Sequence, residues 1–139
     1  MKSILQLLSL FIIGSIVLSS GCKKSGGGGG GGGTTEANLV VTLNPPDGSN
    51  QAATTGPFNL TVTITSTLPA NGVSIAITAK KDDGTNTVFF TSTNNTTTSV
   101  NNYSITNTPV TSLNLVNITV TSLTKATNVW SGSYRYSRK

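Results

Sequence analysis

The chain of 139 residues is long enough for one ordinary domain, and only 9% of its residues are charged, with four acidic side chains and no histidine. The net charge of +5 reflects this scarcity of acids rather than a basic cluster interleaved with aromatic residues, which excludes a nucleic-acid interface. Catalysis and metal binding need titratable side chains placed together, so we expect no enzyme activity, no catalytic or metal-binding residue and no cofactor.

Residues 1–21 are typical of a secretory signal peptide. Lys2 supplies a positive start, and the segment from Ile4 to Leu18 is mainly apolar with a few small or polar interruptions. This segment is shorter than the roughly 20 residues that a helix needs to span a bilayer. We therefore expect a cleaved leader rather than a transmembrane anchor.

The leader ends in Ser19, Ser20, Gly21 and Cys22, and Cys22 is the only cysteine of the chain. This ending resembles the lipobox of bacterial lipoproteins in its relaxed, Bacteroidetes-type form, with Ser19 where leucine is usual. The resemblance implies cleavage between Gly21 and Cys22, diacylglyceryl attachment to the Cys22 sulfur and acylation of the new N-terminus. Two or three acyl chains hold a protein stably on a membrane. A plain cleaved signal peptide is the alternative.

Residues 22–37 are predicted to be a flexible linker after the lipidated cysteine. Lys23 and Lys24 follow Cys22 and either contact anionic headgroups or simply solvate the chain end. Gly26 to Gly33 are all glycine, and polyglycine behaves as a flexible coil. Because no strand precedes this run and no helix follows it, the run is not a phosphate-binding loop.

From residue 38 onward, apolar residues alternate with hydroxyl and amide residues, as in Leu60, Val62 and Ile64 with threonines between them. This period of two is typical of half-buried antiparallel strands. Clusters of Pro, Gly, Asn and Asp separate the runs, and Asp82-Asp83-Gly84 is the clearest hairpin turn. The predicted strands cover residues 38–44, 57–66, 73–80, 86–92, 99–107, 113–122 and 128–137.

We therefore predict that residues 38–139 form one all-β domain, an immunoglobulin-like or fibronectin-III-like antiparallel sandwich of about seven strands. An eight-stranded barrel would need one more strand and is the alternative. In the run over residues 113–122 the apolar residues change parity, which predicts a β-bulge near Leu115–Val116.

The last predicted strand carries Trp130, Tyr134 and Tyr136 at even positions, with Gly132 leaving a gap between the rings. If this face is exposed, the three rings are a candidate ligand-binding platform of the kind that stacks on sugars. If it faces inward, the same rings complete the core, which is the more frequent role of strand aromatics. The sequence leaves both alternatives open.

The expected function is that of a non-catalytic immunoglobulin-like module anchored through Cys22 to a membrane of the bacterial cell envelope. The outer membrane is the expected location, with the periplasmic or surface side left open. The role is structural or adhesive, with a glycan or a protein at the cell surface as the expected partner. A carbohydrate-binding accessory lipoprotein is the alternative, and a threonine-rich edge strand that accepts a partner strand would instead indicate an assembly subunit.

Overall fold

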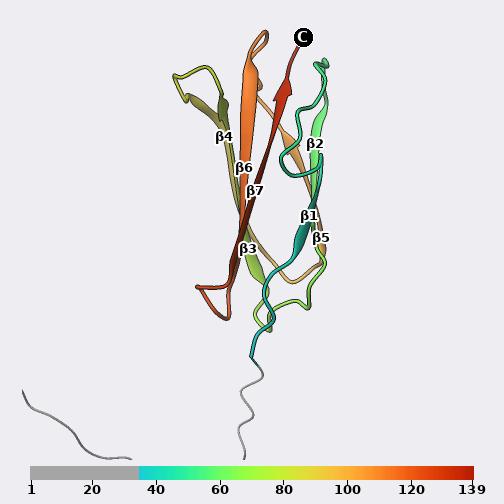
Figure 1. Ribbon diagram of the computed structural model, residues 1–139, viewed down its shortest axis with the longest axis vertical. Helices are drawn as coiled ribbons and strands as arrows, with labels where there is room; N and C mark the ends of the chain where they lie inside the picture. Colours follow the sequence, from blue (N-terminus) through green and yellow to red (C-terminus); the bar gives the residue numbers. More distant parts are fainter. Residues whose placement is uncertain (1–34) are drawn as a thin grey trace, which may run out of the picture. The chain divides into compact units, whose positions relative to one another are not determined.

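A computed structural model describes residues 35–139, which form two antiparallel β-sheets packed face to face (Figure 1). The strands are β1 (Val41–Asn44), β2 (Phe58–Ile64), β3 (Val73–Lys81), β4 (Val88–Thr96), β5 (Val100–Ile105), β6 (Leu113–Ser122) and β7 (Val129–Ser137). One sheet has the order β1-β2-β5 and the other the order β4-β3-β6-β7. The prediction of a seven-stranded all-β sandwich is confirmed. None of the described residues belongs to a helix long and apolar enough to cross a membrane.

The core lies between the sheets and consists of the inward rows that the alternation predicted. Leu60 and Val62 of β2 face Ile75 of β3 and Ile118 of β6, and each of these side chains is at most 1% exposed. Burying a branched apolar side chain contributes about 1.5–3 kcal/mol to folding. The threonines between them point outward, where their hydroxyls remain hydrated and their branched Cβ atoms suit a pleated strand.

The predicted bulge in β6 is wrong. β6 pairs without a register shift with β3 on one side and with β7 on the other. Its inward row begins with Asn114, which is fully buried, whereas Leu113 is 44% exposed on the outer face. The buried amide is satisfied locally, since Asn114 Nδ2 donates to the Ser112 carbonyl at 3.1 Å and Oδ1 accepts from the Ser112 hydroxyl at 3.0 Å. The one shift in the sheet lies between Ala79 and Lys80 in the pairing of β3 with β4.

β4 extends four residues beyond its predicted end at residue 92. Asn94 and Asn95, which resemble turn residues in the sequence, pair instead with Ile75 and Ser74 of β3. Eight residues of β3 pair with β4, and this pairing outweighs the local preference of asparagine for turns. The hairpin turn predicted at Asp82-Asp83-Gly84 is confirmed, because it joins β3 to β4.

The segment of residues 47–54 covers the outer edge of β7. It runs parallel to β7, with isolated bridges from Asn50 to Arg135 and from Thr54 to Arg138. Backbone hydrogen bonds run in both directions, such as Gln51 N to the Arg135 carbonyl at 2.8 Å and Arg135 N to the Ser49 carbonyl at 2.9 Å. The outer edge of β7 is therefore covered along part of its length.

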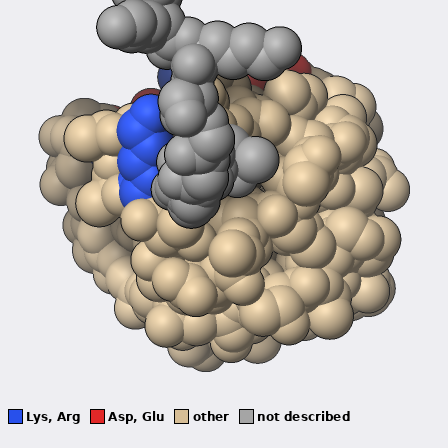
Figure 2. Space-filling model, turned by 90° about the horizontal axis from the view of Figure 1, so that it is seen from below, with Lys and Arg blue, Asp and Glu red and all other residues tan. Residues whose placement is uncertain are grey.

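The two ends of the sandwich differ in charge. The described chain enters at the lower end and finishes at the upper end (Figure 1). Five of the six described lysines and arginines lie at or near the upper end, namely Lys80, Lys81, Arg135, Arg138 and Lys139. The lower end, seen in Figure 2, shows few charged side chains, and Lys125 in the β6–β7 turn is the described cation there.

Candidate functional site

The predicted cleavage and lipidation residues, Gly21 and Cys22, lie outside the described residues. Lipidation therefore stays a prediction. What the structure does describe is how the chain enters the folded domain after the glycine run. Glu36 and Ala37, expected in the linker, are hydrogen-bonded to the domain, so the folded part begins at least two residues earlier than the sequence indicated.

The entry point is held by three hydrogen bonds of Asn128, a side chain of the β6–β7 connection that is 7% exposed. Its Nδ2 donates to Glu36 Oε1 at 2.6 Å and to the Ala37 carbonyl at 2.9 Å. Its Oδ1 accepts from the backbone N–H of Leu39 at 3.0 Å. The hydroxyl of Ser122 donates to the other Glu36 oxygen at 3.0 Å. We call these four contacts, made by Glu36, Ala37, Leu39, Ser122 and Asn128, the entry clasp.

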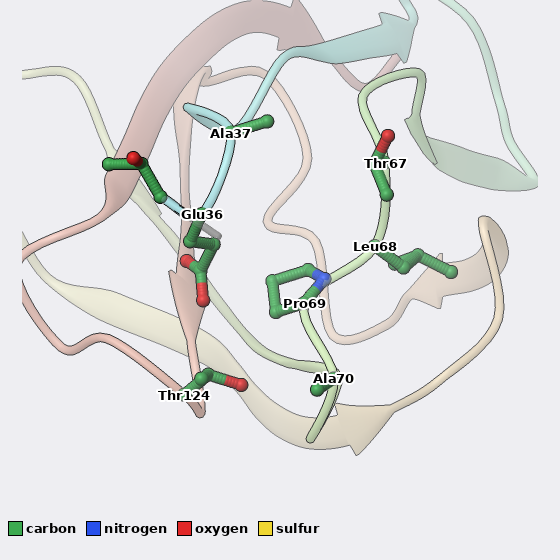
Figure 3. Close-up of a pocket in the computed structure, with 8 residues that line it drawn as sticks. Glu36, Ala37, Thr67, Leu68, Pro69, Ala70 and Thr124 are labelled. Atoms are coloured by element: carbon green, nitrogen blue, oxygen red, sulfur yellow. The ribbon is translucent and has the colours of Figure 1, made fainter. Parts of the chain in front are cut away.

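A cleft of about 420 Å³ lies beside the entry clasp (Figure 3). Figure 3 shows Glu36 between the turn that carries Thr124 and the segment with Leu68 and Pro69. The lining residues are Thr35, Glu36, Ala37, Thr67, Leu68, Pro69, Ala70 and Thr124. Both oxygens of its one carboxylate already accept hydrogen bonds from the entry clasp. The cleft thus offers small apolar groups and hydroxyls, with a carboxylate committed to holding the chain.

Of the two alternatives left open for Trp130, Tyr134 and Tyr136, the exposed platform does not hold for the two tyrosines. Tyr134 and Tyr136 face inward and are each 2% exposed, so they belong to the core. Trp130 is partly buried and packs against the same core. The predicted gap at Gly132 is filled, because the Trp130 ring and the Asp47 carboxylate lie where a Cβ would stand. The two tyrosines thus complete the core, and Trp130 packs against it while remaining partly exposed.

The tyrosines form a cluster with Phe58 near the upper end of the core. The ring centroids of Phe58 and Tyr136 are 4.5 Å apart, and those of Tyr134 and Tyr136 are 6.1 Å apart. The Tyr136 hydroxyl shares a 2.7 Å hydrogen bond with the buried Thr108 hydroxyl. A second cleft, of about 260 Å³, opens between this cluster and Gln51 of the segment that covers β7. Only the margins of the two tyrosines reach it.

Burial raises the pKa of all three tyrosines of the chain. The neighbouring Tyr136 raises the pKa of Tyr134 further. The hydroxyl of Thr108 partly opposes the rise in the pKa of Tyr136, and the side chain of Asn94 partly opposes it for Tyr103. A raised pKa in the folded state means that the fold binds these protons more tightly than the unfolded chain does.

We predict from this that the domain unfolds in alkali. The contribution of the tyrosines to the free energy of unfolding is fully present below the ordinary tyrosine pKa of about 10. It is lost as the pH rises above that value, because the tyrosines of the unfolded chain ionise first. Thermal melts between pH 8 and 12, followed by circular dichroism and by phenolate absorbance, should show a falling Tm above about pH 10, with phenolate appearing together with unfolding. Phenolate that appears near pH 10 without a change in Tm would contradict this prediction.

The aspartates serve local structure. The Asp82 carboxylate pairs with Arg135 at 2.6 Å across the outer face of β6. Asp83 Oδ1 accepts from the Thr85 hydroxyl at 2.6 Å and from the Thr85 N–H at 3.0 Å, and these bonds lower the pKa of Asp83. Asp47 Oδ1 accepts from the N–H of Ser133 at 2.7 Å. Within residues 35–139, no three His, Cys, Asp or Glu side chains gather closely enough to hold a metal ion.

The side of the sandwich opposite the covered edge is open. β4 pairs only with β3, and β5 pairs only with β2, so each sheet ends there in an edge strand. Tyr103 of β5 points between the sheets towards Asn94 of β4, which partly opposes the rise in its pKa. Its hydroxyl is buried without a hydrogen bond of ordinary geometry to the described residues. No sequence motif marks this open side, because its surface carries the same Thr, Ser and Asn residues as the rest of the domain.

Comparisons of the chain with family models, with characterised proteins and with solved structures gave no match.

Proposed function

We propose that this chain is a lipid-anchored protein of the bacterial cell envelope whose folded part is a non-catalytic binding or structural module. The sequence around Cys22 supports the anchor, since an apolar leader and small residues precede the chain's one cysteine. The entry clasp supports a separate tether and folded module, because it fixes the point at one end of the sandwich where the chain from the linker enters the domain.

The observation that carries the proposal is the order of parts along the chain: leader, cysteine, glycine run and then a β-sandwich that begins at a hydrogen-bonded entry point. A glycine linker lets a small domain reorient above a membrane. The upper end, with its cluster of lysines and arginines, would then lie farthest from the point of entry. The outer membrane is the proposed location, and a surface partner the proposed target.

The carbohydrate-binding alternative has less support. It relied on an exposed aromatic strand, and Tyr134 and Tyr136 are core residues. Trp130 alone, with its ring lying over Gly132, does not form a platform with them.

The anchor is tested by intact mass spectrometry of the chain expressed in a bacterium and recovered from the membrane fraction. We expect a polypeptide that begins at Cys22 and carries the added mass of two or three acyl chains. The Cys22→Ala variant should lose both the acyl mass and the membrane association, and Ser25→Ala, which leaves the cysteine intact, is the control. An unmodified wild-type chain in the soluble fraction would refute the proposal.

A further inference from the structure

We propose that the free edge of β4 is a self-association surface through which two copies of this domain pair in antiparallel fashion. The inference deepens the proposed binding role by naming a partner, a second copy of this chain. Three observations support it: β4 is the one sheet edge of the described domain that is neither covered nor short, the two ends of the sandwich differ in charge, and an antiparallel strand pair can have two-fold symmetry.

Three of the four edges are covered or short. The edge of β7 is covered by residues 47–54, as described above. β1 has four residues and is followed by Pro45 and Pro46, and β5 has six residues. Natural sheets protect their edges by covering, by shortness, by proline or by charge, because unpaired backbone groups readily pair with another strand.

β4 has none of these protections over most of its length. It has nine residues, and none is proline or charged. The only irregularity is the register shift near its start, so the part from Phe90 to Thr96 is regularly paired with β3. No hydrogen bond from the backbone of this part to a described residue outside β3 occurs on its other side. Its outward side chains, Thr91, Thr93 and Asn95, are exposed and uncharged.

Two-fold symmetry fixes how β4 can pair with itself. A two-fold axis perpendicular to the sheet places the β4 edges of two copies side by side in opposite directions. The N–H groups of each strand then face the C=O groups of the other, and the result is a closed dimer. An axis centred on the regular part would place Thr93 opposite Thr93 of the second copy and Thr91 opposite Asn95. Threonine pairs and uncharged polar pairs are favourable neighbours across strands.

The charge distribution favours the same arrangement. In an antiparallel pair the basic upper end of each copy lies beside the nearly uncharged lower end of the other. Side-by-side pairing in the same direction would instead bring together two ends that each carry five cations, of which Asp82 and Asp83 offset two, so both ends would be net positive. Like charges in close apposition cost free energy, so the antiparallel orientation is the compatible one.

The test is sedimentation of the purified full chain, in mild detergent if it is acylated, over micromolar to millimolar concentrations. We expect the average mass to approach twice the monomer mass as concentration rises. The double variant Thr91→Lys/Thr93→Lys, which puts lysines on the exposed face of β4, should raise the dissociation constant at least tenfold while leaving Tm nearly unchanged. The control Val40→Lys/Thr42→Lys carries the same added charge at the β1 edge and should dimerise as the wild type does. A wild type that stays monomeric would overturn the proposal, and so would a β4 variant that dimerises normally.

Cross-linking tests the geometry separately. In a Cys22→Ala background, Thr93→Cys should form an intermolecular disulfide, because the two positions meet at the axis. Asn86→Cys should not, since Asn86 precedes the first residue of β4, and the five strand steps from Val88 to Thr93 on each side of the axis already put the two positions more than roughly 30 Å apart. Efficient disulfide formation at position 86 but not at position 93 would overturn antiparallel pairing. Because these measurements use mass and cross-links of purified protein, they can fail while the acyl-mass experiment succeeds, and the reverse also holds.

Discussion

Replacing Gly72 by alanine should lower the free energy of unfolding by about 3 kcal/mol or more, from the combined cost of a strained backbone and an overpacked site. Gly72 has φ +78°, a region that residues with a Cβ rarely adopt. A Cβ there would overlap the backbone carbonyl oxygen of Thr96, which cannot rotate away as a flexible side chain can. Relief would require movement of the end of β4 or of the turn that leads into β3. Urea denaturation followed by fluorescence of the one tryptophan measures the change.

Gly84→Ala is the matched control. Gly84 has φ +85°, close to that of Gly72, but open space surrounds the position where its Cβ would stand. The control therefore carries the backbone strain without the collision and should cost about 1 kcal/mol. Equal losses for the two variants would show that the collision with Thr96 contributes nothing.

Asn128→Ala should have the second-largest effect, a loss of about 2–4 kcal/mol. The substitution removes three hydrogen bonds of the entry clasp, one of them to a carboxylate, and leaves the N–H of the buried Leu39 without its partner. Hydrogen bonds to charged groups contribute more than neutral ones, and an orphaned buried donor carries its own cost. Since small domains are stable by only about 5–15 kcal/mol, this is a large share.

Thr127→Ala is the control for this prediction, because Thr127 lies in the same turn and is exposed. It should change stability by less than about 0.5 kcal/mol. Hydrogen exchange adds a local readout: the Leu39 amide should exchange faster in Asn128→Ala, even under conditions where the core of β3 and β6 stays protected. If Leu39 exchanges equally in both variants, the entry clasp does not hold the chain.

The strands were predictable because their signal is local. Alternation such as Leu60, Val62 and Ile64 reports which face is buried, and turn residues such as those around Gly84 mark where strands end. The errors occurred where partners outweigh local preference. Asn94 and Asn95 continue β4 because β3 lies beside them, and the buried position of Asn114 depends on Ser112 and on neighbouring strands.

The candidate sites were less predictable, because they depend on contacts between distant segments. Glu36 and Asn128 are 92 positions apart, and neither lies in a motif that would connect them. The parity of Tyr134 and Tyr136 showed that they share a face but did not show which face is inside. The pairing of residues 47–54 with β7 has no sequence signature either, since it uses backbone atoms. The free edge of β4 can be recognised only when the strand order of both sheets and the covering of the other edges are known.

The entry clasp also determines how the domain would respond to mechanical pulling. The chain enters at the lower end, and β1 then runs alongside β2 in the antiparallel direction. A force applied at Glu36 along the strand axis would strain the clasp and the β1–β2 hydrogen bonds together, in shear, rather than opening them one at a time as in a zipper. Bonds that must break together resist force better than bonds that break in sequence. A domain held by its N-terminal segment in a flowing medium would thus be pulled in its mechanically stronger direction.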